Sequence, residues 1–130
     1  MFLDSSALVA IMANEHDGPM LAARLEGAPD PVTSPIVIYE ATLALRRKAM
    51  LAVEAVLTDV RDFLARAGVA VVPVNPDDHI IALQAFARYG KGTGSAAQLN
   101  LGDCFSYAVA KRRGIPLLYK GNDFAQTDLR

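Results

Sequence analysis

The chain has 130 residues, of which 52% are hydrophobic and 21% charged, and its formal net charge is −1. This is the size and composition of one globular domain; intrinsic disorder is excluded, and the near-neutral charge gives no general attraction to nucleic acid. The single cysteine, Cys104, excludes an intramolecular disulfide and a cysteine zinc cluster, so a reducing cytoplasm is the expected compartment. We expect no membrane span and no secretory signal, because apolar runs are short and the first residues carry no basic group.

The first half of the chain predicts two short strands, each followed by helices. Apolar residues recur at helical spacing over 5–12, and Asp4, Ser5 or Ser6 could cap that helix. Pro35 fits the first turn of a later helix, because its fixed φ suits that position and its missing N–H costs nothing there. The expected elements are a strand at 1–3, helices at 5–12 and 19–26, a strand at 32–34, and helices at 35–48 and 51–67.

The second half continues the alternation of strands and helices. Residues 69–74 are apolar and mostly β-branched, as expected for a strand that is covered on both faces. The expected elements are a strand at 69–74, a helix at 76–89, a flexible loop at 90–95, a helix at 101–113, a strand at 116–119 and an edge strand at 127–129. This alternation predicts a single α/β domain over residues 1–130 with a mainly parallel sheet.

Three acidic residues fall where parallel sheets bind their ligands, at the carboxyl ends of the strands. Asp4 directly follows the first strand, and Asp123 follows the strand at 116–119. Asp103 lies in the first turn of the helix at 101–113, and the N-termini of such helices lie at the same edge of the sheet. We therefore expect these three carboxylates to converge.

Glu40 interrupts the apolar face that its helix should turn toward the sheet. Its neighbours three and four residues away are Ile36, Val37, Leu43 and Ala44. A buried carboxylate without a partner is costly, and it tends to take up a proton or a cation. The acid therefore signals either an ion pair or a cation-binding site.

Each acid also has a purely structural explanation. These are a helix cap for Asp4, a capping box with Asn100 for Asp103, an Asx turn for Asp123, and an ion pair with Arg47 for Glu40. Four carboxylates at one edge would repel one another, so their clustering favours neutralisation by a hard cation. Oxygen ligands with open water positions suit Mg²⁺ or Mn²⁺.

The local sequences around the four acids resemble those of the PIN-domain nucleases, and most closely the VapC toxins of bacterial toxin–antitoxin pairs. The likeness is carried by residues 1–8, 35–41, 99–108 and 117–124, and it runs over nearly the whole chain. One departure is visible at 94–98, which reads Gly-Ser-Ala-Ala-Gln where many relatives have a His-Pro pair. None of the four acids is affected, so the departure bears on substrate preference.

The resemblance implies a three-layer α/β/α PIN-like domain and a Mg²⁺-dependent endoribonuclease, with Mn²⁺ as a substitute cofactor. Asp4 and Asp103 would be the main metal ligands, joined by Glu40, with Asp123 bound directly or through water. A metal-activated water would cleave RNA phosphodiester bonds to leave 5′-phosphate and 3′-hydroxyl ends. The family pattern also implies a homodimer and a neutralising VapB-type antitoxin.

Four cations become candidate RNA phosphate contacts under this resemblance, namely Lys111, Arg112, Arg113 and Lys120. The first three could equally be a solvated helix end, since cations are favoured beside the carbonyl-rich terminus. Their role is therefore open at the level of sequence.

A different class of function also fits part of the pattern. A receiver-like phosphorylation switch binds Mg²⁺ at strand ends and has a lysine after a late strand, a place that Lys120 fits. A receiver needs two adjacent acids after its first strand and a phosphoacceptor after its third, and this chain supplies only Asp4 at the first of these places. A HAD-type phosphatase needs an acid at position 6, which is Ser6, and a catalytically dead PIN-like module would lack one of the four acids.

Overall fold

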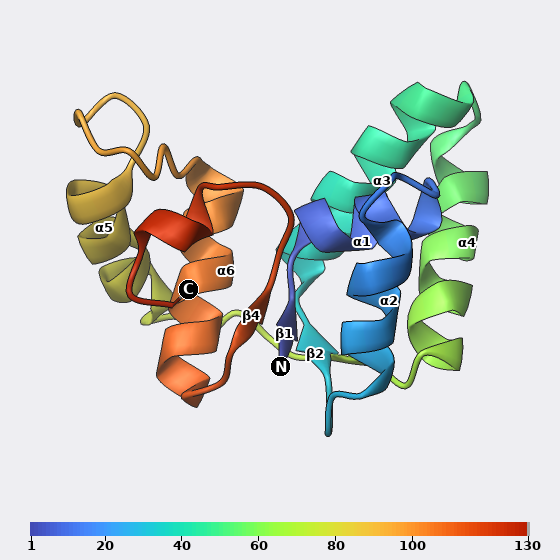
Figure 1. The fold of residues 1–130 in the computed structure, drawn as a ribbon, viewed down its shortest axis with the longest axis horizontal. Helices are drawn as coiled ribbons and strands as arrows, with labels where there is room; N and C mark the ends of the chain where they lie inside the picture. Colours follow the sequence, from blue (N-terminus) through green and yellow to red (C-terminus); the bar gives the residue numbers. More distant parts are fainter. Residues whose placement is uncertain (130) are drawn as a thin grey trace.

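The computed structural model describes residues 1–129 and contains a parallel sheet of four very short strands between helices (Figure 1). The strands are β1 Phe2–Leu3, β2 Val32–Thr33, β3 Ala70–Val71 and β4 Leu117–Leu118. They lie in the order β3-β2-β1-β4, and every neighbouring pair is parallel. All four carboxyl ends therefore point to one edge of the sheet, and the predicted three-layer α/β/α architecture is confirmed.

Helices α5 and α6 lie together on one side of the strands, and α1, α2 and α4 lie on the other (Figure 1). Helix α3 contacts α1, α4 and α6. The helices are α1 Ser5–Met12, α2 Gly18–Glu26, α3 Pro35–Ala49, α4 Val53–Arg66, α5 Asp78–Tyr89 and α6 Leu101–Arg113, followed by the 3₁₀ helix η1 Phe124–Gln126. None of the helices within the described residues is long and apolar enough to cross a membrane.

Local sequence signals explain where the site-bearing helices begin and end. The Ser34 hydroxyl accepts a hydrogen bond from the Val37 N–H, and Pro35 occupies the first turn of α3. Helix α6 ends at Gly114, whose φ of 64° is a left-handed conformation that glycine adopts without strain. These signals fix the start of α3 and the end of α6, and the apolar residues within each helix can then pack toward the sheet.

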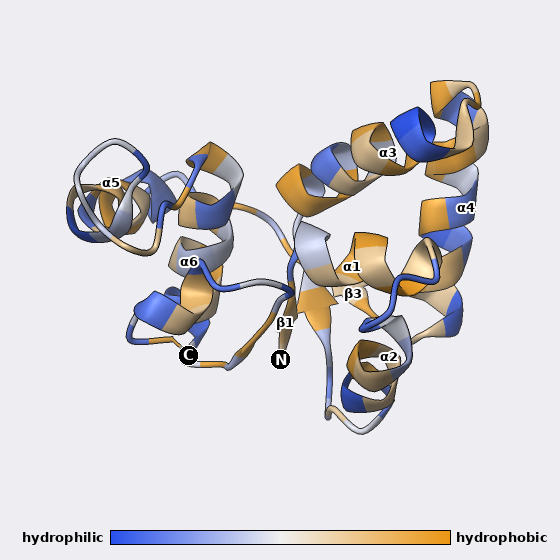
Figure 2. Cartoon of the chain, turned by 45° about the horizontal axis from the view of Figure 1, so that its top comes forward, coloured by the Kyte–Doolittle hydropathy of each residue, from blue (hydrophilic) through white to orange (hydrophobic). Residues whose placement is uncertain are grey.

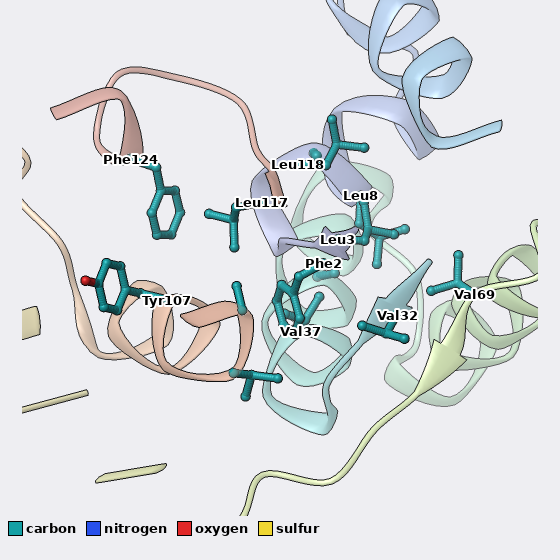
Figure 3. Close-up of a cluster of buried hydrophobic side chains, with 14 of the residues drawn as sticks. Phe2, Leu3, Leu8, Val32, Val37, Val69, Tyr107, Leu117, Leu118 and Phe124 are labelled. Atoms are coloured by element: carbon teal, nitrogen blue, oxygen red, sulfur yellow. The ribbon is translucent and has the colours of Figure 1, made fainter. Parts of the chain in front are cut away.

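The hydrophobic core is centred on β1, and the central strands are strongly hydrophobic (Figure 2). Phe2 and Leu3 are fully buried, with 0% of their surface exposed. Figure 3 shows Phe2 beside Val37 of α3, with Leu117 of β4 on the side toward α6. Burying such side chains stabilises the fold by roughly 1.5–3 kcal/mol each, which holds the ends of β1 and β4 side by side.

Two strand predictions are wrong: the strand at 69–74 is much shorter than expected, and residues 127–129 form no strand. Residues 69–74 were expected to be covered on both faces, yet β3 is an edge strand of two residues and Val71 is 50% exposed. Pro73, which has no N–H to donate, follows the last strand bond, from the Val72 N–H to the Thr33 carbonyl. The strand expected at 127–129 is a turn instead, in which the Thr127 hydroxyl donates to the Phe124 carbonyl and accepts a hydrogen bond from the Leu129 N–H.

Candidate active site

Asp4 is the buried centre of the acidic edge, with 1% of its surface exposed. Its Oδ2 accepts hydrogen bonds from the Ser6 N–H at 2.9 Å and the Ser6 hydroxyl at 2.6 Å, so it caps α1 as one explanation predicted. Its Oδ1 accepts a hydrogen bond from the Ser106 hydroxyl of α6 at 2.8 Å. Donors from two helices thus fix both oxygens of Asp4, which goes beyond what a cap requires.

The Ser6 hydroxyl also links this centre to the end of β4. It accepts a hydrogen bond from the Lys120 N–H at 3.0 Å, while the Asp4 N–H donates to the Leu118 carbonyl. The position of Asp4 is therefore locked by β1, α1, α6 and the segment after β4.

Glu40 reaches the same place from α3, and it does so over Gly102 of α6. A Cβ added to Gly102 would overlap both carboxylate oxygens of Glu40, so only glycine leaves room for that side chain. Within residues 1–129, the buried Oε1 of Glu40 has no hydrogen-bond partner, and no ion pair joins Glu40 to Arg47. The ion-pair explanation for Glu40 is therefore wrong.

The pKa of Glu40 is raised to about 7, mainly by burial and then by the charges of Asp4 and Asp103, against a smaller lowering by a hydrogen bond with the Ser5 side chain. The carboxylate form of Glu40 is thus disfavoured unless a cation joins the cluster. This is the electrostatic signature of a site that lacks a positive partner.

Asp103 forms the predicted capping box. Its N–H donates to the Asn100 side chain at 2.9 Å, and its Oδ2 accepts from the Asn100 N–H at 3.0 Å. Burial nevertheless raises its pKa to about 6, because the charges of Asp4 and Asp123 add to the desolvation and outweigh the Asn100 hydrogen bond. The box fixes Oδ2 of Asp103 and does not engage Oδ1.

Asp123 lies at the exposed rim, just before η1, and its side chain makes no capping hydrogen bond. Its charge acts on Asp103, whose own charge acts on Glu40. Asp103 therefore links Asp123 at the rim electrostatically with Asp4 and Glu40.

The donor set suits a hard divalent cation, although no three His, Cys, Asp or Glu side chains in residues 1–129 stand ready to ligate one ion together. Magnesium keeps several waters and needs only one or two carboxylates from the protein. Oε1 of Glu40 has no partner within residues 1–129, and the pKa values of Glu40 and Asp103 are raised. Both observations indicate carboxylates that a nearby positive charge would stabilise. The residues present therefore fit such an ion.

The basic cluster at the end of α6 is not part of this site. Lys111 donates to Asp128 at 2.8 Å, and Arg112 binds the fully buried Asp78 through two hydrogen bonds of 2.6 and 3.2 Å. Arg113 lies beside Met1 and Pro116, which precede β1 and β4 at the opposite edge of the sheet. Helix α6 thus carries these three cations away from Asp103, and their contact with RNA phosphates stays a prediction.

Lys120 does lie at the acidic edge, but its ammonium is already paired. It binds Glu15 at 2.5 Å and lies 3.8 Å from Asp17, while Glu15 also binds Lys48 at 3.0 Å. These ion pairs make the Lys120 ammonium less available to bind an RNA phosphate.

Sequence reasoning missed Ser106 and Gly102. Ser106 lies one helical turn after Asp103, so their shared face on α6 was a usable signal. The role of Gly102 depends on Glu40, which lies on a different helix, and no local pattern reveals it.

Comparisons with known proteins give a consistent result. The model of the PIN domain family matches residues 1–129. A VapC ribonuclease of Rhizobium meliloti is 40% identical over 98% of both chains, and ribonuclease VapC42 of Mycobacterium tuberculosis is 36% identical over 100% of this chain and 97% of its own. The crystal structure of Mycobacterium tuberculosis VapC20, described as a sarcin-ricin loop cleaving toxin, has a TM-score of 0.77 and covers 99% of this chain and 95% of that one. At 20% identity, this structural likeness speaks for the fold.

Proposed function

Because the chain belongs to the PIN domain family, among relatives of the VapC ribonuclease type, we propose that it is a divalent-metal-dependent endoribonuclease and the toxic member of a toxin–antitoxin pair. The observation that carries the proposal is Glu40. Its carboxylate is held over Gly102, shares the charges of Asp4 and Asp103, and has a buried oxygen without a partner in the described residues. Such an arrangement is unfavourable by itself and becomes favourable around a cation.

Asp4 and Asp103 are the proposed main ligands of Mg²⁺, or of Mn²⁺ in its place, joined by Glu40, with Asp123 binding directly or through water. A bound ion of this kind lowers the pKa of a coordinated water and neutralises charge on the scissile phosphate. The protein's own contribution is orientation, because Ser6 and Ser106 fix Asp4 while Asn100 fixes Asp103. A polyanionic RNA could not approach four uncompensated carboxylates, so cation binding and RNA binding should be coupled.

The proposal includes a cytoplasmic location, a homodimer and a VapB-type antitoxin as partner. Exposed apolar side chains, among them Met50 at 90% and Leu101 at 72%, support protein contacts on this small chain. The acidic site itself would accept an antitoxin arginine, because a guanidinium pairs with carboxylates in a fork geometry. Growth arrest on expression of the chain alone, and its relief by the product of an adjacent small gene, would test this part directly.

The receiver alternative finds no support. The family match and the relatives point to the PIN domain, and β3 ends at Val71 without the acidic residue that a phosphoacceptor strand requires. Cleavage of RNA without uptake of phosphate from acetyl phosphate is the expected outcome of a direct comparison.

The raised pKa values predict how stability depends on pH and metal. Without metal, folded Glu40 and Asp103 keep protons that the unfolded chain has lost between about pH 4 and 7, so the free energy of unfolding should fall as the pH rises through this window. Magnesium should restore it by RT ln(1 + [M]/Kd), about 2.7 kcal/mol at a hundredfold excess over Kd, or on the order of 10 °C in melting temperature at most.

Glu40→Gln provides the matched comparison for this pH dependence. The amide carries no charge, so the variant should lose less stability than wild type between pH 5 and 8 in chelator and should gain less from magnesium. Melting curves at fixed ionic strength measure both effects. Equal gains from magnesium in the two proteins would contradict a metal site that includes Glu40.

Gly102→Ala should separate activity from stability. Alanine favours a helix over glycine by about 0.5–1 kcal/mol, and the carboxylate that it displaces is the mobile end of Glu40, so the melting temperature should stay the same or rise. RNA cleavage should fall at least tenfold, the lower bound expected when a ligand loses its support. Gly27→Ala is the control, since a Cβ there meets only ordinary van der Waals contact; equal activity of both variants would contradict the placement of Glu40.

A further inference from the structure

A groove of about 590 Å³ opens beside the acids and is not explained by metal binding alone. It lies between α1, α3 and the segment after β4, and Glu40 belongs to both the groove and the acidic cluster. Val9, Leu43 and Ala44 give it an apolar floor. A substrate bound at the acids could therefore continue into this groove without a break.

The α3 wall of the groove carries an aromatic ring and a cation. Tyr39 is 67% exposed, an unusual exposure for an aromatic side chain next to a half-buried acid. Arg47 is exposed, and no ion pair engages it in the part of the chain that the structure describes. Arg47 follows Glu40 by seven residues, which places it on the same face of α3 about 10 Å farther along the helix.

The opposite wall has its charges balanced internally. Lys120 and Glu15 both line the groove, and they are bound to each other. Arg47 is therefore the positive charge of the groove that can take an external anion. An aromatic platform and a cation beside an apolar floor are the elements that bind a base and a phosphate of single-stranded nucleic acid.

We infer that this groove binds the RNA nucleotide next to the scissile phosphate, with its base on Tyr39 and the apolar floor and its phosphate on Arg47. This inference rests on the proposed ribonuclease function, because the acids define where the scissile phosphate lies. A protein partner could also bind apolar and basic groups, but two features favour RNA. The groove is continuous with the acids, and among its lining residues in 1–129 Arg47 is the cation without an ion pair.

Tyr39→Ala should weaken binding of a short single-stranded RNA by about 5- to 150-fold, the range for losing one stacked base. Arg47→Gln should also weaken binding, because it removes a phosphate contact. Binding is measured by fluorescence anisotropy in Ca²⁺, and the KM for cleavage in Mg²⁺ should rise in parallel while kcat changes less. Arg47→Gln should also reduce the slope of log affinity against log salt by about one. Tyr39→Phe should retain binding, because the ring is kept.

Arg46→Gln is the matched control, since Arg46 is an exposed neighbour that does not line the groove. An RNA with an abasic nucleotide next to the cleaved bond should bind wild type and Tyr39→Ala alike. If both groove variants bound and cleaved intact RNA as wild type does, the nucleotide site would be overturned while the ribonuclease function stood. If wild type bound RNA through Tyr39 and Arg47 yet cleaved nothing in Mg²⁺, the groove would stand and the proposed function would fall.

Discussion

Replacing Asp103 with Asn should lower the rate of RNA cleavage by at least about 100-fold, the upper end of the loss seen for residues that only support a metal ligand. The substitution removes a charge from the centre of the cluster while preserving size. The capping box should survive, because an Asn side-chain oxygen can still accept the hydrogen bond from the Asn100 N–H. Burial already disfavours the charged form of Asp103, so the metal-free variant should melt at or above the temperature of wild type.

Asp62→Asn is the control for the Asp103 variant, because Asp62 is an exposed acid on α4. Single-turnover cleavage of a defined RNA and melting curves measure the two effects separately. Full activity of folded Asp103→Asn would contradict Asp103 as a metal ligand and would leave helix capping as its function.

Arg112→Met should produce the largest loss of stability, about 3–5 kcal/mol, as expected when a buried ion pair loses one partner. For a chain of this size, such a loss corresponds to a fall of roughly 10–20 °C in melting temperature. The reason is Asp78, which is fully buried and would keep an uncompensated charge. Asp78→Asn should cost less, because the Arg112 side chain is 29% exposed and can be solvated.

The pH dependence of the Arg112 variant follows from the same pair. In wild type, burial works to raise the pKa of Asp78, but Arg112 and the Asn75 N–H outweigh it and lower the pKa. The stabilisation is therefore present above the ordinary carboxyl pKa of about 4 and is lost as the pH falls through the lowered value. Arg112→Met should accordingly cost more at pH 7 than at pH 4.

Two further proteins control this result. Combining Arg112→Met with Asp78→Asn should recover much of the loss, since it removes the stranded charge and keeps an acceptor for the Asn75 N–H. Lys111→Gln breaks only the exposed pair with Asp128 and should cost at most about 1 kcal/mol. Equal losses for Lys111→Gln and Arg112→Met would contradict the structural role of Asp78.

The fold was predictable because the strands, although only two residues long, sit in short apolar stretches between helices with clear start and stop signals. The extent of the strand near Val71 was not, because an apolar β-branched run looks the same in a covered strand and at an edge. Its exposure is decided by strand order, which is a property of the whole sheet.

Asp4, Asp103 and Asp123 could be singled out from the sequence, since their places after strands and in a first turn follow from the parallel topology. Glu40 could be singled out because it interrupts the apolar face of its helix. The partners of the basic cluster were not, because Asp78 lies 34 residues from Arg112 and Asp128 lies 17 from Lys111. The local sequence correctly predicts a helix end that is rich in cations. The acidic partners of these cations are brought to them only by tertiary packing.

The most direct measurement is cleavage of a short defined RNA by the wild-type protein across a magnesium series that begins in chelator, with Asp103→Asn purified in parallel as the baseline. We expect no cleavage above that baseline in chelator, a saturable rise with Mg²⁺ or Mn²⁺, and products that end in 5′-phosphate and 3′-hydroxyl groups. Cleavage in chelator at the rate found in magnesium, or equal rates for wild type and Asp103→Asn, would contradict a metal-dependent nuclease site at these four acids.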